Sequence, residues 1–238
     1  MCREERVRLR VWSAVAAIVL ITAACGSDRP AEEPRPASAP APAAETPAPA
    51  SVRPKVVILG DSLTAGLGLP RAEAYPTLLQ ERVDGNQLNY EIVNAGVSGD
   101  TSAAGLRRLG WALEGNVRVL VVALGANDGL RALSTEELRR NLDEIIRRAQ
   151  EQKIAVVLAG MEALPNLGPE YAKAFHDVYP SLAKTYGVPL VPFLLDGVAG
   201  SPALNQTDGI HPTAEGARRV ADNVWPVLEP VLRREQAP

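Results

Sequence analysis

Two short segments, far apart in the chain, carry the groups needed for nucleophilic catalysis. The first is a Gly-Asp-Ser turn that ends an apolar run and presents Ser62. The second contains Asp208 and His211, three residues apart. A serine hydroxyl is a weak nucleophile until a neighbouring base takes its proton. The spacing lets the Asp208 carboxylate hold the Nδ1–H of His211, which leaves Nε2 free to face Ser62.

Other polar residues have simpler interpretations. His176, the only other histidine, lies within a helical pattern and is expected to be an ordinary helix residue. Asp61 is expected to be a hydrogen-bond partner within its own loop, although a role as the catalytic acid stays open. Ser98 is a rival nucleophile, but it lacks a strand-to-helix turn that would expose it. Asp100 is expected to cap the helix that follows it.

The chain around these segments alternates between strand and helix patterns. Short Val/Ile/Leu runs predict strands at 55–60, 90–96, 117–125, 154–161 and 188–193. Prolines break the last run, which therefore indicates an edge strand. Apolar residues at helical spacing predict helices at 74–83, 101–115, 134–152, 169–187 and 212–232. Ser134 and Glu137 form a capping-box pattern at the start of the third of these.

Continuous apolar strands separated by helices predict a parallel sheet that is buried on both faces. The handedness of the crossover connections then makes the fold class α/β, a three-layer α/β/α sandwich with five strands. In such sheets, active sites form beyond the carboxyl ends of the strands. The two catalytic segments both belong to loops at that end.

Three better-known glycine-rich motifs do not fit the sequence. A Walker loop requires Gly-Lys-Ser/Thr, but Leu67 follows Gly66. A dinucleotide fingerprint starting at Gly66 lacks its third glycine, because Arg71 stands there. The nucleophile elbow Gly-x-Ser-x-Gly fails because Thr64 occupies the second glycine position. The serine therefore belongs to a different arrangement.

Four blocks, in order along the chain, resemble the GDSL or SGNH hydrolase family. "GDSL" contains Ser62, "SGDTS" contains Gly99, "GAND" contains Asn127, and "DGIHP" contains Asp208 and His211. The likeness is greatest to the bacterial multifunctional esterases of this family, the arylesterase, thioesterase I and lysophospholipase L1 group. It extends from about residue 55 to residue 232.

The resemblance implies the flavodoxin-like type of three-layer sandwich. It also implies a serine esterase with Ser62 as nucleophile, His211 as base and Asp208 as the orienting acid. The oxyanion donors would be the backbone N–H groups of Ser62 and Gly99 and the side-chain amide of Asn127. This chemistry requires no metal or organic cofactor.

Four apolar residues in two neighbouring loops are expected to line a groove for the acyl chain of the substrate: Leu130, Leu133, Leu164 and Pro165. In the resembled group this region accommodates acyl chains, which favours aryl esters, short- and medium-chain esters, thioesters or lysophospholipids. Two alternatives stay open. The same triad could remove acetyl groups from cell-envelope or plant glycans, or the chain could be a binding lipoprotein that has lost catalysis.

The N-terminal segment predicts export. Residues 1–24 combine an arginine-rich start with an apolar run of 14 residues, which is typical of a signal peptide. Small residues precede Cys25, a pattern that resembles a bacterial lipoprotein signal with Cys25 as the lipidated mature N-terminus. An ordinary secretory signal, with Cys25 a bystander, is the alternative. Residues 25–54 are rich in Pro and Ala and predict a disordered linker before the hydrolase domain at 55–238.

Composition narrows the possible partners. The net charge of -3 provides no basic field for binding nucleic acid. Cys2 and Cys25 are the two cysteines, so the domain at 55–238 has neither a disulfide framework nor a cysteine metal site. The expected partners are a small-molecule or lipid ester and, through the lipid anchor, a membrane; no obligate protein partner is implied. The expected location is the cell envelope, at the periplasmic face of the outer membrane in a Gram-negative cell.

Overall fold

The structure is a computed structural model that describes residues 53–236. The predicted signal peptide, Cys25 and nearly all of the predicted linker lie outside the described residues. Among residues 53–236, no helix combines the length and the apolar character needed to cross a bilayer.

Five parallel strands form one sheet in the order β2-β1-β3-β4-β5. Their bounds are β1 Lys55–Gly60, β2 Glu91–Gly96, β3 Val117–Ala123, β4 Ala155–Ala159 and β5 Leu190–Val191. The predicted five-stranded parallel sheet is thus confirmed. Its central strands β1 and β3 are buried along nearly their whole length, as continuous apolar runs require. Prolines flank the two residues of β5, and this strand lies at an edge as expected.

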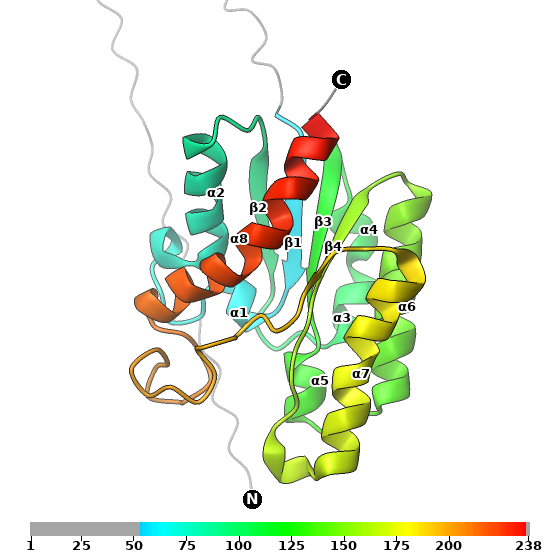
Figure 1. Ribbon diagram of the computed structural model, residues 1–238, viewed down its shortest axis with the longest axis vertical. Helices are drawn as coiled ribbons and strands as arrows, with labels where there is room; N and C mark the ends of the chain where they lie inside the picture. The colour runs from blue at the N-terminus through cyan, green and yellow to red at the C-terminus, as the bar shows by residue number, and fades with distance from the viewer. Residues whose placement is uncertain (1–52, 237–238) are drawn as a thin grey trace, which may run out of the picture. The chain divides into compact units, whose positions relative to one another are not determined.

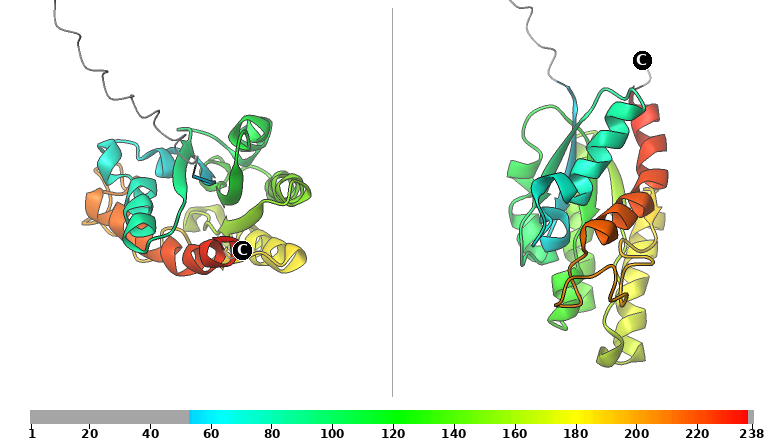
Figure 2. Two further views of the ribbon diagram at one scale, coloured as in Figure 1. Left: turned by 90° about the horizontal axis from the view of Figure 1, so that it is seen from above. Right: turned by 90° about the vertical axis from the view of Figure 1, so that its left-hand side faces the viewer.

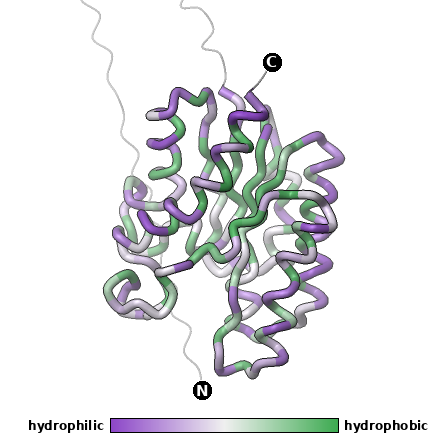
Figure 3. The backbone as a smooth tube through the Cα atoms, viewed as in Figure 1, coloured by the Kyte–Doolittle hydropathy of each residue, from purple (hydrophilic) through white to green (hydrophobic). Residues whose placement is uncertain are grey.

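Helices cover both faces of the sheet (Figures 1 and 2). The longer helix α2 Tyr75–Gly85 packs against the C-terminal helix α8 Ala214–Gln236, while α6 Thr135–Glu151 packs against both α3 Ser102–Arg107 and α7 Pro169–Tyr186. The short helices are α1 Ser62–Ala65, η1 Arg71–Glu73, α4 Leu109–Ala112, α5 Ala126–Leu130 and η2 Pro165–Leu167. Figure 3 shows apolar residues along the strands and mixed polar and apolar residues along the outer helices. The expected α/β fold is confirmed.

Helix α6 shows how the pattern sets the packing. Its apolar residues recur at helical spacing and are all fully buried: Leu138, Leu142, Ile145, Ile146 and Ala149. Ser134 caps the helix by accepting a hydrogen bond from the backbone N–H of Glu137 at 3.3 Å. In a full capping box the Glu137 carboxylate would also accept the backbone N–H of Ser134. Here Glu137 pairs with Arg140 instead, and Ser134 Oγ donates to Glu136.

The prediction of one helix over 101–115 with Asp100 as its cap is wrong in two respects. It divides into α3 and α4 at Arg108, whose backbone leaves the helical geometry. The Arg108 guanidinium turns inward, where it pairs with Asp100 at 2.6 Å and donates to the carbonyl of Gly60 at 2.8 Å. Asp100 is therefore occupied by an ion pair, and Thr101 caps α3 instead, through Ala104 N.

Candidate active site

Ser62 stands at the first position of α1, immediately after β1, at the carboxyl end of the sheet. The Asp61 side chain caps this short helix by accepting the N–H of Leu63 at 3.0 Å. Gly60 makes the sharp turn possible, because a Cβ there would lie 1.9 Å from Thr64 Oγ1. The strand ends abruptly and the hydroxyl of Ser62 is held at the sheet's edge.

The loop before α8 brings His211 to this serine. His211 Nε2 lies 2.8 Å from Ser62 Oγ, and its Nδ1 lies 2.6 Å from Asp208 Oδ2. The other carboxylate oxygen of Asp208 accepts the backbone N–H groups of His211 at 3.0 Å and Ile210 at 2.9 Å. The structure therefore joins the three residues of the predicted triad in one hydrogen-bonded chain.

The carboxyl of Asp208 is ionised at neutral pH. Its pKa is lowered to about 2 by the hydrogen bond from the His211 backbone N–H, then by the bond from the His211 ring and by the N–H of Ile210. A carboxylate in this position fixes the ring and favours the tautomer with the proton on Nδ1. The lone pair of Nε2 is then directed at the Ser62 hydroxyl, where it can accept the proton.

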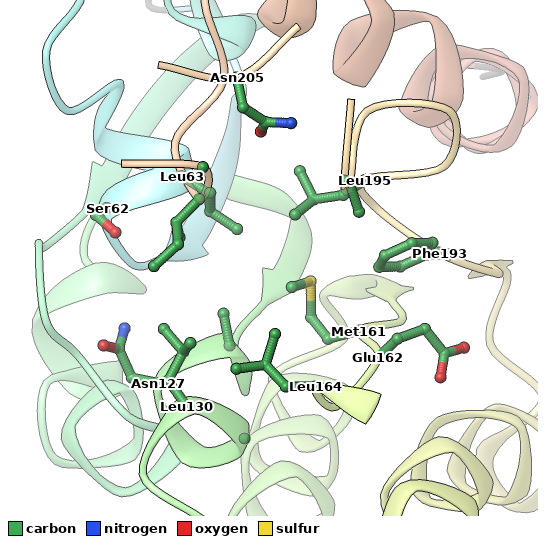
Figure 4. Close-up of a pocket in the computed structure, with 16 residues that line it drawn as sticks. Ser62, Leu63, Asn127, Leu130, Met161, Glu162, Leu164, Phe193, Leu195 and Asn205 are labelled. Carbon is green, nitrogen blue, oxygen red and sulfur yellow. The ribbon is translucent and has the colours of Figure 1, made fainter. Parts of the chain in front are cut away.

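Asn127, in α5, presents its amide beside Ser62 at the carboxyl end of β3 (Figure 4). One contact of its Nδ2 is a 3.0 Å bond to the carbonyl of Asp100, which fixes the side chain. The other contact, to Asp61 Oδ2, is long at 3.4 Å. The second N–H is therefore weakly held and is the one available to a developing oxyanion.

Gly99 lies in the turn between β2 and α3 with a φ of 86°, a conformation that favours glycine. Arg131, at the end of α5, donates to the Gly99 carbonyl at 2.9 Å and so ties this turn to the helix that carries Asn127. Ser98, the rival nucleophile, lies exposed in this strand-to-helix turn, so the predicted lack of such a turn is wrong. The base nevertheless contacts the other serine, because His211 Nε2 lies beside Ser62 Oγ.

Two buried carboxyl groups, those of Asp61 and Asp128, form hydrogen bonds that fix the segments of the site. Asp61 is 1 % exposed, and burial raises its pKa to about 6 against the lowering effect of its bonds with Leu63 N–H and Asn127. Burial also raises the pKa of Asp128, which accepts the backbone N–H of Ser102 at 2.8 Å and its hydroxyl at 2.5 Å. The Asp128–Ser102 contact locks α5 to the start of α3. The sequence did not predict this contact. The one feature that pointed to Asp128 was its position next to Asn127.

A mostly apolar cavity of about 140 Å³ opens beside Ser62 (Figure 4). Leu130 and Leu164 line it, as the sequence predicts, but Leu133 and Pro165 are not among its lining residues. The rest of the apolar wall includes residues that sequence analysis missed: Leu63, Met161, Phe193, Leu195 and Ile210. Their signal was position, because each follows or adjoins the carboxyl end of a strand or a catalytic residue.

Glu162 supplies a charge to the cavity lining. Its carboxylate lies 2.6 Å from Nδ1 of His176, which is a largely exposed residue of α7 as the sequence predicts. Within residues 53–236, no cluster of three or more His, Cys, Asp or Glu side chains could hold a metal ion.

Comparison with known proteins settles the family. The model of the GDSL-like Lipase/Acylhydrolase family matches residues 58–219. The chain belongs to this family. The sequence-based prediction of family and fold is thereby confirmed, and the chain is a hydrolase that acts on esters.

Three relatives match most of the chain. Esterase TesA of Pseudomonas aeruginosa is 42 % identical over 178 residues, which span 74 % of this chain and 89 % of the relative. Thioesterase 1/protease 1/lysophospholipase L1 of Escherichia coli K12 is 36 % identical over 181 residues, or 76 % of this chain and 86 % of the relative. Arylesterase of Vibrio mimicus is 36 % identical over 171 residues, or 71 % and 86 %.

Solved structures agree with the fold of this GDSL-family hydrolase. The crystal structure of TesA superposes with a TM-score of 0.72 at 41 % identity, over 74 % of this chain and 99 % of the other. AlinE4, an SGNH-hydrolase family esterase, superposes with a TM-score of 0.63 at 42 % identity, over 76 % and 97 %.

Proposed function

We propose that the protein is an exported serine esterase that hydrolyses acyl esters with short to medium chains, including aryl esters, thioesters and lysophospholipids, through an acyl-enzyme. The observation that carries the proposal is the continuous chain of hydrogen bonds from Asp208 through His211 to Ser62, which ends at an apolar cavity. The names of the relatives, an esterase, an arylesterase and a thioesterase/lysophospholipase, support the same substrate classes.

The geometry supports a two-step reaction. His211 Nε2 takes the proton of the Ser62 hydroxyl as Oγ attacks the ester carbonyl, and the carbonyl oxygen becomes an oxyanion facing Asn127 and Gly99. His211 then gives its proton to the departing alcohol or thiol as the bond to the acyl carbon breaks. A water molecule repeats the sequence on the acyl-enzyme, which releases the acid and restores Ser62.

Chain-length preference tests the role of the cavity. Each methylene buried against the apolar wall should contribute up to about 0.8 kcal/mol, a few-fold in kcat/KM per carbon. We expect kcat/KM to rise from acetyl toward medium-chain p-nitrophenyl esters until the cavity is full. Leu164→Asp should flatten this rise and leave acetyl-ester turnover nearly intact, because the triad and oxyanion donors do not include Leu164.

Leu133→Asp is the matched control, since Leu133 is similarly exposed but does not line the cavity. It should keep the chain-length dependence of the unmodified enzyme. A wild-type enzyme that prefers acetate, with no gain from longer chains, would contradict the proposal and support the glycan O-acetylesterase instead.

We further propose that a lipid on Cys25 anchors the enzyme at the cell envelope, on the basis of the sequence pattern around that cysteine. Two or three acyl chains at one site give stable membrane attachment, which a single chain does not. Cys25→Ser should therefore move the protein from the membrane fraction to the soluble fraction or leave its signal uncleaved. The measurement is membrane fractionation together with mass spectrometry of the mature N-terminus.

Cys2→Ser is the control, because this cysteine lies in the segment that the signal peptidase removes; it should fractionate like the wild type. A mature protein that begins at another residue and carries no lipid would refute the anchor.

A further inference from the structure

The loop that carries Asp208 and His211 is closed by backbone hydrogen bonds between its two ends. The N–H of Gln206 donates to the carbonyl of His211 at 2.7 Å, and the N–H of Gly209 donates to the carbonyl of Gln206 at 2.9 Å. Asn205 and Pro212 form an isolated antiparallel bridge at the same point. Gln206 therefore lies directly across the loop from the catalytic histidine.

The Gln206 side chain reaches out of this loop to the segment of the nucleophile. Its Nε2 donates to the carbonyl of Leu67 at 2.7 Å and to the carbonyl of Pro212 at 2.9 Å. The N–H of Leu67 in turn donates to the carbonyl of Ser62 at 3.1 Å. One amide thus links the carbonyl next to His211 to the turn that closes α1.

The nucleophile segment is shaped to receive this amide. Gly68 has a φ of 80°, and a Cβ on it would lie 2.2 Å from Gln206 Oε1, so a side chain at this position would displace the amide. Within the described chain, the one other hydrogen bond between the two segments is the catalytic contact of His211 Nε2 with Ser62 Oγ.

The loop itself has little packing to fix its position. Residues 207–210 are exposed, and the Asp208 side chain is 45 % exposed. A base and a nucleophile 149 positions apart in sequence must nevertheless meet within hydrogen-bond distance. A fixed link beside His211 meets that need, since displacement of a catalytic group by about 1 Å costs as much as 10²-fold in rate.

We propose that Gln206 is a positioning residue that sets the distance between His211 Nε2 and Ser62 Oγ. The inference rests on the proposed function, because it takes Ser62 and His211 as nucleophile and base. Without the amide, the loop keeps its internal backbone bonds but loses its link to Leu67. The ring of His211 then spends less time within reach of the hydroxyl, which slows attack, while the cavity wall outside this loop, including Leu130, Leu164 and Phe193, stays in place.

Gln206→Met tests this role, because it keeps the length of the side chain and removes both N–H donors. We expect kcat/KM for a p-nitrophenyl ester to fall about 10- to 100-fold. The fall should come from kcat, while KM should stay within about twofold of the wild-type value. Phosphonylation of Ser62 by an aryl phosphonate ester should slow by a similar factor, since it needs the same base. Gln206→Asn keeps the amide but shortens its reach, and it should lose activity in the same manner.

Gln150→Met is the matched control. The Gln150 amide also links two segments through a backbone carbonyl, that of Tyr186 at 3.2 Å, but it joins α6 to α7 and makes no contact with the triad. It should keep kcat while it reports the thermal stability lost with such a link. If folded Gln206→Met and Gln206→Asn enzymes keep kcat within threefold of the wild type, or lose no more than Gln150→Met, the positioning role is refuted. Ser62→Ala, assayed alongside, separates the two claims, because its full activity would instead overturn the proposed function.

Discussion

Ser62→Ala and His211→Ala should each lower kcat by roughly 10³-fold or more. Ser62 Oγ forms the bond to the acyl carbon, and His211 is the group within reach of its proton, at 2.8 Å. No neighbouring side chain can replace the nucleophile or the base, so loss of either residue should remove almost the whole contribution of the triad to kcat. Asp208→Ala should cost less, because Asp208 orients the ring and takes no part in bond formation.

Steady-state hydrolysis of a p-nitrophenyl ester measures these losses, and labelling with an active-site serine probe shows whether the nucleophile reacts. The chain offers matched controls for the serine variant and the histidine variant. Ser98→Ala removes the rival serine of the Gly99 turn, and His176→Ala removes the histidine that contacts Glu162. Both should keep kcat near that of the wild type. If Ser62→Ala retains activity and Ser98→Ala loses it, the nucleophile has been assigned to the wrong segment.

The sheet was predictable because its strands can be recognised in the sequence as short apolar runs. A strand buried on both faces must be apolar at every position, so β1 and β3 stand out as continuous Val/Ile/Leu runs. The carboxyl-end rule then placed the Ser62 and His211 segments together without any knowledge of their contact. Local patterns could not reveal the inward turn of the Arg108 guanidinium, because its partner is the carbonyl of Gly60, 48 positions away.

The acyl cavity was predicted in part, and backbone direction explains the difference. Leu130 and Leu133 have helical spacing, but Ala132 adopts a φ of 48°, which turns the chain so that the two side chains do not share a wall. In the other loop, Leu164 lines the cavity, while Pro165 begins the short helix η2. Phe193 and Leu195 come from beyond the edge strand β5, and only the tertiary fold brings them to Ser62.

Asn127→Ala should lower kcat by about 10²- to 10³-fold and change KM little, because its N–H serves an oxyanion that exists in the transition state and not in the bound ester. The structure provides the donor ready for use: one N–H anchors the amide on the Asp100 carbonyl, while the other has the long 3.4 Å contact with Asp61. Binding of a boronic acid, which mimics the tetrahedral intermediate, should weaken in parallel with kcat, whereas binding of the product acid should not.

Asn86→Ala is the control for loss of a side-chain amide, since Asn86 donates to the Arg82 carbonyl at the end of α2, away from the site. It should leave kcat and boronic acid affinity unchanged. The Asn127 substitution also leaves the Asp100 carbonyl without its partner, so thermal unfolding of both variants is measured to exclude a general loss of structure. A folded Asn127→Ala enzyme with kcat within threefold of the wild type would show that the backbone N–H groups of Ser62 and Gly99 suffice for the oxyanion.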